Sequence, residues 1–228
     1  MQECRNAELQ ECRDNKMNRV TCHASRVTVL PTAYLPPIAY VSEVLRSDEV
    51  IIEIHETYTK QTSRNRCDIY GPNGRQTLSI PVVKVNGNHT LIRDIRISNN
   101  SRWQSIHWRS IETAYSNAPY FLYYRDLFYP AFRKRFEFLL DFNQSLLESV
   151  FRSMKAHKPI RFTATYDKLV DRTISDSLVA KRVTINNPEY RQVFHERHGF
   201  LPNLSVIDAI FNLGPETADY FSSCPVFS

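Results

Sequence analysis

The sequence predicts an α/β protein in which a part rich in strands comes before a mostly helical part. Up to Asn99, apolar residues come mainly in short runs separated by turn residues, which is typical of strands. Beyond Asn99, they recur at the three- and four-residue spacing of amphipathic helices. We therefore expect an α/β part over about residues 26–98 and a helical part over about residues 101–221.

The α/β part is expected to open with two strands joined through one helix. The apolar stretches predict a strand at 27–31, a helix at about 38–46 and a second strand at 49–54, with a proline-rich loop before the helix. A strand–helix–strand order is typical of a parallel pair with a right-handed crossover. The sequence therefore begins with an α/β unit.

Three further strands are expected at about 66–70, 76–83 and 91–97. The turn sequences "GPNG" and Asn86-Gly87 separate them, and both favour tight reversals of the chain. This pattern predicts an antiparallel meander.

The helical part is expected to contain two longer helices, a short strand and further helices at the end. "SRWQSIHWRSIETAYSNA" starts at a serine cap and stops near Pro119. "RFEFLLDFNQSLLESVFRSMKAH" places on one face Phe136, Leu139, Leu140, Asn143, Leu146, Leu147, Val150, Phe151 and Met154. A short strand is expected in "IRFTATYD", followed by two or three helices, the second of them capped by Ser205.

Composition and charge exclude several classes of protein. Hydrophobic residues make up 42% and charged residues 23% of the chain, as in ordinary globular proteins. No apolar run reaches the length of a transmembrane helix. Residues 1–25 are polar, without the apolar region of a secretory signal. We expect a flexible extension there, Met17 as a possible natural start, and a cytoplasmic protein.

The basic charge favours anionic small molecules over nucleic acid. The net charge of +5 comes from 29 basic and 24 acidic residues, a modest excess that is spread along the chain. The five cysteines form no C-x-x-C pair, so no metal site is expected. Only five glycines are present, and none forms a phosphate-binding motif. A phosphate would therefore be held by side chains or by a helix N-terminus.

Two loops that follow the first two strands are the candidate binding region. "PTAYLPPIAY" offers the ring and hydroxyl of Tyr34 to a ligand, or forms a rigid aromatic plug over the core. "HETYTKQTSRNR" concentrates donors for phosphate or carboxylate in Lys60, Arg64, Asn65 and Arg66, or is a solvated basic loop. Both loops leave the same edge of the sheet, so we expect them to face each other.

The first long helix offers one candidate base. His107 lies one turn from Trp103 and from Ile111, where it can act as a general base or be a core histidine with a hydrogen-bonded neighbour. Tyr115 and Tyr120 belong to an aromatic stretch that suits stacking on a sugar or base, or simple helix packing. His195 and His198 lie three residues apart but have no carboxylate cluster, so we assign no metal.

Taken in order, these stretches resemble the WbqC-like family of bacterial proteins. The resemblance covers about residues 27–221 and lies in "LPTAYLPPIAYVSEVLRSDEVII", "YTKQTSRNRCDIYGPNG", "LSIPV", "WQSIHWRSIETAYSNAPYF" and "HGFLPNLSVIDAIFNLGPE". It implies a single WbqC-like domain over residues 26–228 and a role in surface-polysaccharide or O-antigen synthesis, on a nucleotide-linked and often amino sugar. Members typically carry Gln-Pro before the tyrosine loop, whereas this chain reads Leu30-Pro31-Thr32-Ala33.

A fainter likeness connects the opening unit with nucleotidyltransferases that carry an H-x-G-H motif. This chain has Ala39-Tyr40 where that motif would fall, and no histidine in the loop. Adenylyl transfer by that mechanism would therefore lack its stabilising groups.

Two functions follow from these observations. The first is a transferase that modifies a nucleotide-linked sugar, with the Arg64–Arg66 stretch holding phosphate, Tyr34 stacking on a ring and His107 deprotonating the acceptor. The alternative is a non-catalytic sugar-nucleotide binding or scaffolding protein of the same pathway. Whether the chain is an enzyme depends on whether His107 reaches the pocket between the two loops. The sequence assigns no cofactor and no oligomeric state.

Overall fold

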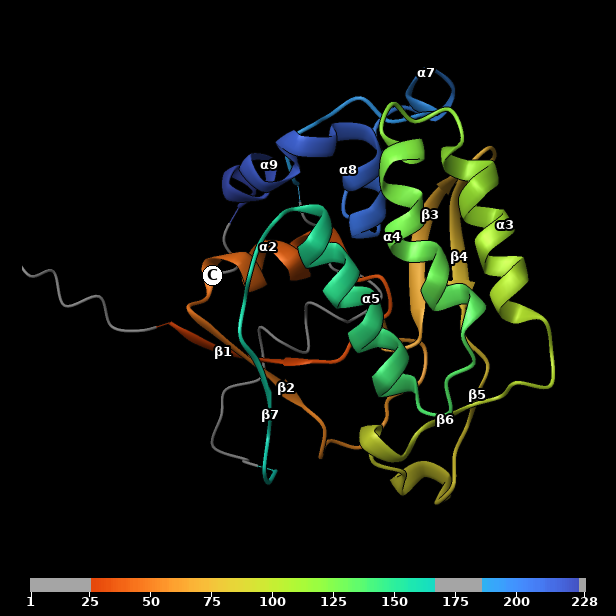
Figure 1. Ribbon diagram of the computed structural model, residues 1–228, viewed down its shortest axis with the longest axis vertical. Helices are drawn as coiled ribbons and strands as arrows, with labels where there is room; N and C mark the ends of the chain where they lie inside the picture. Colours follow the sequence, from red (N-terminus) through yellow and green to blue (C-terminus); the bar gives the residue numbers. More distant parts are fainter. Residues whose placement is uncertain (1–25, 167–185, 226–228) are drawn as a thin grey trace, which may run out of the picture.

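The computed structural model describes residues 26–166 and 186–225, arranged as Figure 1 shows. The extension expected over residues 1–25, with Met17, lies outside the described residues. The predicted α/β class is confirmed: strands dominate up to residue 97, longer helices follow, and helix exceeds strand among the described residues.

A three-stranded parallel sheet forms one side of the molecule. Strand β1 (Val27–Pro31), helix α2 (Ile38–Arg46) and strand β2 (Glu49–Glu53) agree with the expected bounds to within one residue. β1 and β2 run parallel, and β7 (Ile160–Phe162) pairs in parallel with the other side of β2. All three strands therefore point their carboxyl ends toward one edge.

The expected meander is wrong in its third strand. β3 (Arg66–Gly71) and β4 (Gly74–Ser79) form a tight antiparallel hairpin, as "GPNG" indicates. The expected strand at 91–97 is instead a 3-10 turn, Ile92–Asp94, and a two-residue strand, β6 (Arg96–Ile97), which pairs with β5 (Val82–Val83).

Local hydrogen bonds explain why Asn86-Gly87 does not form a tight hairpin. Gly87 has a φ of 57° and opens a second 3-10 turn, Gly87–His89. The Thr90 hydroxyl accepts the Asn86 N–H at 2.9 Å and donates to the Gly87 carbonyl at 3.0 Å. This side chain satisfies backbone groups that a strand ladder would otherwise pair.

The helical part contains five helices of seven or more residues among the described segments. They are α3 (Trp103–Tyr115), α4 (Phe121–Arg133), α5 (Leu139–Ser153), α8 (Val206–Leu213) and α9 (Thr217–Ser223), with a one-turn helix α7 (His195–His198) between them and a 3-10 turn, Gly214–Glu216, between α8 and α9.

Two helix starts differ from expectation. α3 has Arg102 at its N-cap and no side-chain capping bond, so Ser101 is not its cap. α5 begins at Leu139 because the preceding residues run beside β6: Ile97 donates its N–H to the Glu137 carbonyl at 2.8 Å. Ser205 does precede α8, but its hydroxyl donates to the Leu35 carbonyl at 2.9 Å instead of capping the helix.

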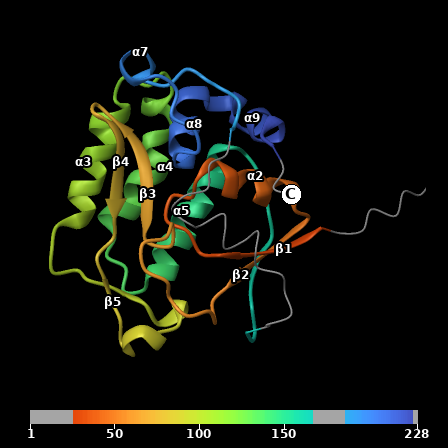
Figure 2. The ribbon, with the colours of Figure 1, turned by 180° about the vertical axis from the view of Figure 1, so that it is seen from behind.

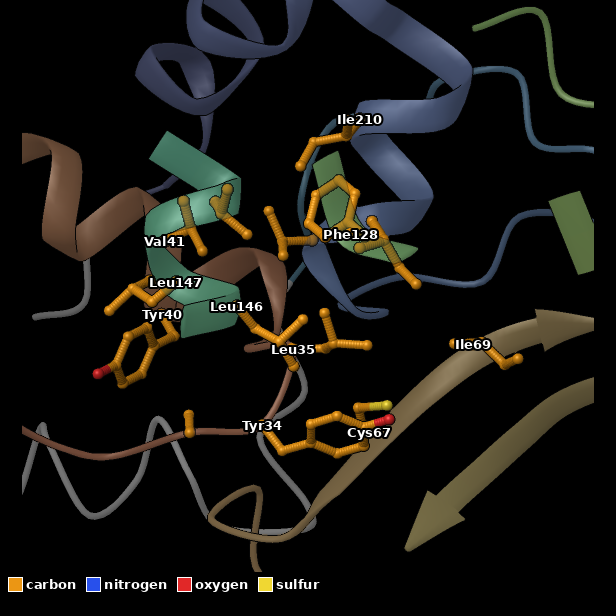
Figure 3. Close-up of a cluster of buried hydrophobic side chains, with 14 of the residues drawn as sticks. Tyr34, Leu35, Tyr40, Val41, Cys67, Ile69, Phe128, Leu146, Leu147 and Ile210 are labelled. Carbon is orange, nitrogen blue, oxygen red and sulfur yellow. The ribbon is translucent and has the colours of Figure 1, made fainter. Parts of the chain in front are cut away.

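The helices cover the hairpin and meet the parallel sheet through one core. α3 and α4 lie on one face of the β3–β4 hairpin. The two strands lie behind these helices in Figure 1 and in front of them in Figure 2. α5 packs on α4, and Figure 3 shows side chains of the tyrosine loop, α2, α5 and β3 meeting in the core. Burying each large apolar side chain contributes about 1.5–3 kcal/mol. No described helix is long and apolar enough to cross a membrane.

Candidate functional site

The two loops that follow β1 and β2 meet at the carboxyl edge of the parallel sheet. Tyr34 donates its backbone N–H to the Ser63 carbonyl at 2.8 Å. The buried Asn143 side chain of α5 donates to the Thr32 hydroxyl at 3.1 Å and to the Arg64 carbonyl at 2.8 Å. One side chain of α5 therefore fixes both loops, and the loops face each other as expected.

Arg64 is part of the interior of the loop. Its guanidinium binds the Glu56 carboxylate in a bidentate manner, with Nε–Oε1 and Nη2–Oε2 distances of 2.7 Å each. Arg64 is 3% and Glu56 8% exposed. A buried pair of this geometry orders the loop between the two residues.

Asn65 links the same loop to the end of β4. Its side-chain amide donates to the Ile80 carbonyl at 3.0 Å, and its backbone carbonyl accepts the Ile80 N–H at 2.9 Å. The side-chain oxygen is buried and has no hydrogen-bond partner among the described residues. One acceptor of Asn65 is therefore left for another group.

Arg66 differs from Arg64 although it lies only two residues away. It is half-buried, its Nε is buried without a hydrogen-bond partner, and it makes no ion pair within the described part of the chain. Burial raises the pKa of the neighbouring Tyr58, and the positive charges of Arg66 and Arg64 oppose that rise. Lys84 lies over the same tyrosine ring, 5.3 Å from its centroid. Lys60, which precedes Arg64 in the same loop, is exposed.

These contacts place positive charge around Tyr58. The ammonium of Lys84 lies over the Tyr58 ring, the charge of Arg66 acts on the hydroxyl of the same residue, and Arg66 has no described carboxylate to neutralise it. Arginine binds phosphate and carboxylate through paired N–H groups. The arrangement can therefore hold an anion.

Tyr34 and His107 form a buried pair beneath the loops. The Tyr34 hydroxyl lies 2.9 Å from His107 Nδ1, and a backbone hydrogen bond joins His107 to Ser79. Burial lowers the pKa of His107 to about 4, and the Ser79 bond opposes that shift. The imidazole is therefore neutral near pH 7, and we infer that its Nδ1 accepts a hydrogen bond from the Tyr34 hydroxyl while the other nitrogen donates to the Ser79 carbonyl.

The surroundings of this pair are aromatic and apolar. Trp103 and Phe142 pack on it, with the Trp103 and His107 ring centroids 5.2 Å apart and those of Tyr34 and Phe142 5.8 Å apart. Tyr34 extends from its loop toward Cys67 of β3 (Figure 3), and burial raises the pKa of both groups. Tyr34 is fully buried and His107 is 4% exposed, so neither ring offers a face to solvent.

The expected site residues therefore fall into two groups. Tyr34, Arg64, Asn65, Arg66 and His107 lie in or directly below the two loops, with Lys60 on their surface.

Tyr115 and Tyr120 belong to another part of the molecule. Tyr115 lies eight residues after His107, about 12 Å further along the same helix. It is fully buried, and its hydroxyl accepts the Tyr70 N–H at 3.1 Å. Tyr120 is half-buried against Gly214.

Three polar residues that complete the loops were not identified from the sequence. Glu56 gives no sequence signal, because a carboxylate eight residues before an arginine is common. Thr32 gives no sequence signal either, because a lone threonine in a proline-rich loop is common. Asn143 does give a signal: it is the polar residue on the apolar face of α5, where burial demands hydrogen-bond partners.

The two histidines near the C-terminus lie on the one-turn helix α7. His198 Nε2 lies 2.9 Å from the Pro72 carbonyl, at the hairpin turn. Within residues 26–166 and 186–225, no group of three or more histidine, cysteine, aspartate or glutamate residues is placed to hold a metal ion.

The fold agrees with the order of motifs described above. It is an α/β protein that opens with a strand–helix–strand unit, continues with a hairpin and has paired loops after its first two strands. The chain belongs to the WbqC-like protein family, whose model matches residues 32–184. It is also 25% identical over 228 residues to "Uncharacterized protein Rv1507c" of Mycobacterium tuberculosis (strain ATCC 25618 / H37Rv), a match that covers 87% of this chain and 98% of that protein. No solved structure matches the chain. The two loops and His107 lie inside the family match.

Proposed function

We infer that the protein binds the phosphate of a nucleotide-linked sugar through Arg66, as one step in the synthesis of bacterial surface polysaccharide. The observation that carries this proposal is the state of Arg66: a half-buried guanidinium whose Nε has no hydrogen-bond partner among residues 26–166 and 186–225. A buried donor without a partner costs about 1–3 kcal/mol. A ligand oxygen would remove that cost.

Other groups in the loops support an anionic ligand with polar substituents. Lys84 adds a second positive charge at Tyr58, and the Asn65 side-chain oxygen is an acceptor without a described partner. No glycine-rich loop supplies backbone amides, so side chains must provide most of the charge that binds phosphate. The sugar nucleotide itself is the expectation that the family resemblance adds.

The loops have the rigidity that a binding site needs. Leu35, directly after Tyr34, is a non-glycine residue with a φ of 39°. It is held by the Ser205 hydroxyl on its carbonyl, and Val206 donates its N–H to the Pro36 carbonyl at 2.8 Å. Backbone strain of this kind persists only where the surrounding structure enforces it, and it concentrates at functional sites.

Group transfer is the second candidate, and the Tyr34–His107 pair favours it. The Tyr34 hydroxyl can pass its proton to Nδ1 of the imidazole while it takes the proton of an acceptor amine or hydroxyl, and the lowered pKa of His107 makes this imidazole a weak base. Both side chains are buried, so this reaction requires the loop at 32–37 to open. Binding alone requires no such movement, and for that reason it is the function that the geometry supports best.

A thermal-unfolding screen tests the binding step. The ligands are nucleoside diphosphate sugars, the matching uncharged nucleosides, and the free sugars. We expect stabilisation only by the phosphate-bearing ligands, by about 2.7 kcal/mol at a hundredfold excess over Kd. Equal stabilisation by an uncharged nucleoside, or no stabilisation by any diphosphate sugar, would contradict the proposal.

The group-transfer step has its own test. The best sugar nucleotide is incubated with acyl and aminoacyl donors, and its mass is followed. A mass increase that is lost in the Tyr34→Phe protein, while that protein still binds the sugar nucleotide, would support transfer through the pair. An unchanged mass with every donor would contradict the transferase function, while the binding function would still stand.

A further inference from the structure

A basic surface lies outside the two loops, on the exposed side of α3 and at the end of α4. Its exposed cations are Arg102, Arg109, Arg133, Lys134 and Arg135. None of them makes an ion pair within residues 26–166 and 186–225. The sugar-nucleotide site uses none of these side chains, so their charge is left without an assigned function.

Two segments that are distant in the sequence lie side by side to form this surface. Gln104 donates its side-chain amide to the Lys134 carbonyl at 2.6 Å, and Asn99 donates its own to the Phe136 carbonyl at 3.0 Å. Arg102 lies between these two anchors in the chain and therefore close to residues 133–136. Arg109 follows Arg102 by about two helical turns, on the same side of α3. α3 forms one flank of the molecule in both Figure 1 and Figure 2.

No nearby carboxylate neutralises this surface. Neither aspartate nor glutamate occurs in residues 95–111 or 127–136 of the sequence. The acids that border these stretches have arginine partners of their own, because Glu137 pairs with Arg96 and Glu112 with Arg125. α3 also has no acid in its first turn and no side-chain cap, so its N-terminal dipole adds to the positive potential.

One large apolar side chain projects among the cations. Ile106 lies one helical turn after Arg102 and about one turn before Arg109, and it is 59% exposed. An aliphatic side chain gains free energy where it leaves water for an apolar medium, and the phosphate backbone of a nucleic acid offers none. Cations around an exposed aliphatic group suit the boundary between lipid headgroups and acyl chains.

We propose that this surface, the five cations with Ile106, binds peripherally to a membrane that contains anionic lipid. The cations contact the lipid phosphates, and Ile106 enters the outermost part of the acyl region. Clusters of about four to eight cations are typical of segments that bind anionic lipid. The surface is separate from Arg66, and membrane binding does not depend on the sugar-nucleotide site.

Sedimentation of the full-length protein with lipid vesicles tests the proposal. One set of vesicles contains phosphatidylcholine alone, and the other contains an equimolar mixture with phosphatidylglycerol. We expect binding to the mixed vesicles only, and weaker binding as the salt concentration rises, because salt screens exposed charges. Equal binding to both vesicles, or no binding to the mixed ones, would overturn the proposal.

A variant without the three cations at the end of α4 tests which charges bind. It carries Arg133→Gln, Lys134→Gln and Arg135→Gln together. Each cation near an anionic membrane contributes about fivefold to affinity, so binding to the mixed vesicles should weaken roughly a hundredfold. Its thermal unfolding should match that of the wild type, because the three side chains are exposed.

The matched control removes three exposed cations from other elements, the end of α5 and α7. It carries Arg152→Gln, Lys155→Gln and Arg197→Gln together. The control loses the same net charge and should weaken binding by no more than a few fold. If both triple variants lose affinity equally, the attraction is due to net charge alone and the assignment of this surface is wrong.

Variants of Ile106 distinguish a membrane from a nucleic acid. In Ile106→Trp, the new indole should emit at shorter wavelength with the mixed vesicles, while Trp103 and Trp108 are buried and give a constant background. Ile106→Ser keeps every charge and should weaken vesicle binding by roughly fivefold. Unchanged emission of the first variant would contradict insertion. Tight binding of duplex DNA at the same salt concentration, with vesicle binding unaffected by Ile106→Ser, would identify a nucleic-acid site and overturn the proposal.

Discussion

Arg64 and Arg66 show how two residues of one basic loop acquire different surroundings. The sequence places Arg64, Asn65 and Arg66 together and predicts an anion site, but it gives no means of telling a structural arginine from a binding one. The distinction comes from Glu56, which binds the Nε and Nη2 groups of Arg64 and makes no ion pair with Arg66. Such a pairing depends on the path of the loop, which local sequence patterns do not determine.

Arg64→Ala should therefore reduce stability. The change leaves the Glu56 carboxylate buried without its partner, which costs about 3–5 kcal/mol. Chemical unfolding of the variant and the wild type measures the difference in free energy. Arg133→Ala, on the exposed end of α4, is the control and should stay within about 0.5 kcal/mol of the wild type. A loss below about 1 kcal/mol for Arg64→Ala would contradict the structural role.

At the scale of elements, sequence patterns were most informative where a period and a turn signal agree. β1 ends at Pro31, α2 starts after Pro37, and the β3–β4 hairpin turns between Gly71 and Gly74. Sequence patterns were less informative where a side chain replaces a backbone partner, as Thr90 does after β5 and as Ser205 does beside Leu35. Side-chain-to-backbone bonds of this kind compete with regular elements and follow from tertiary contacts.

The connection between α8 and α9 depends on one glycine. Gly214 has a φ of 58°, and a Cβ at this position would lie 2.5 Å from the Tyr120 ring. Gly214→Ala adds backbone strain of about 1–2 kcal/mol to overpacking of about 1–3 kcal/mol. We therefore expect a loss of about 2–5 kcal/mol in chemical unfolding.

Gly87→Ala is the matched control for this prediction. Gly87 has a φ of 57°, but a Cβ there would meet no atom within 4 Å. Its substitution should cost only the backbone strain, about 1–2 kcal/mol. If both variants lose the same stability, the packing of Tyr120 against Gly214 does not contribute.

At the scale of the whole molecule, two buried groups give stability opposite dependences on pH. Burial lowers the pKa of His107 in α3 to about 4, from an ordinary value of 6.5. Because the unfolded histidine then binds a proton more readily, stability falls as the pH drops from about 6.5 to about 4. Burial raises the pKa of Asp208 in α8 to about 6 from 3.8, against hydrogen bonds from Tyr190 and Gln192, so its contribution falls as the pH rises through that range.

Asp208→Asn should remove the pH dependence of stability that Asp208 contributes and leave that of His107. The amide keeps an oxygen for Tyr190 and Gln192 but does not titrate. A difference of about two units between the pKa values of the folded and unfolded states corresponds to about 3 kcal/mol in the free energy of unfolding. The wild type should therefore gain about 3 kcal/mol on the variant as the pH falls from about 6 to about 4. Urea unfolding at a series of pH values measures this, and a constant difference between the two proteins would show that Asp208 does not titrate in this range.

The central claim is that Arg66 holds the phosphate of the ligand, and isothermal titration of the Arg66→Ala protein tests it most directly. The ligand is the diphosphate sugar that gives the largest thermal shift. Loss of one charge-assisted hydrogen-bonding group costs about 1.5–3 kcal/mol of binding free energy. Affinity should therefore fall roughly ten- to a hundredfold, with little change in the stability of the protein. Arg133→Ala and Arg135→Ala, exposed in "FRKRF", should bind as the wild type does. If these two variants lose binding while Arg66→Ala retains it, the phosphate site lies on the helical side of the molecule and the account is contradicted.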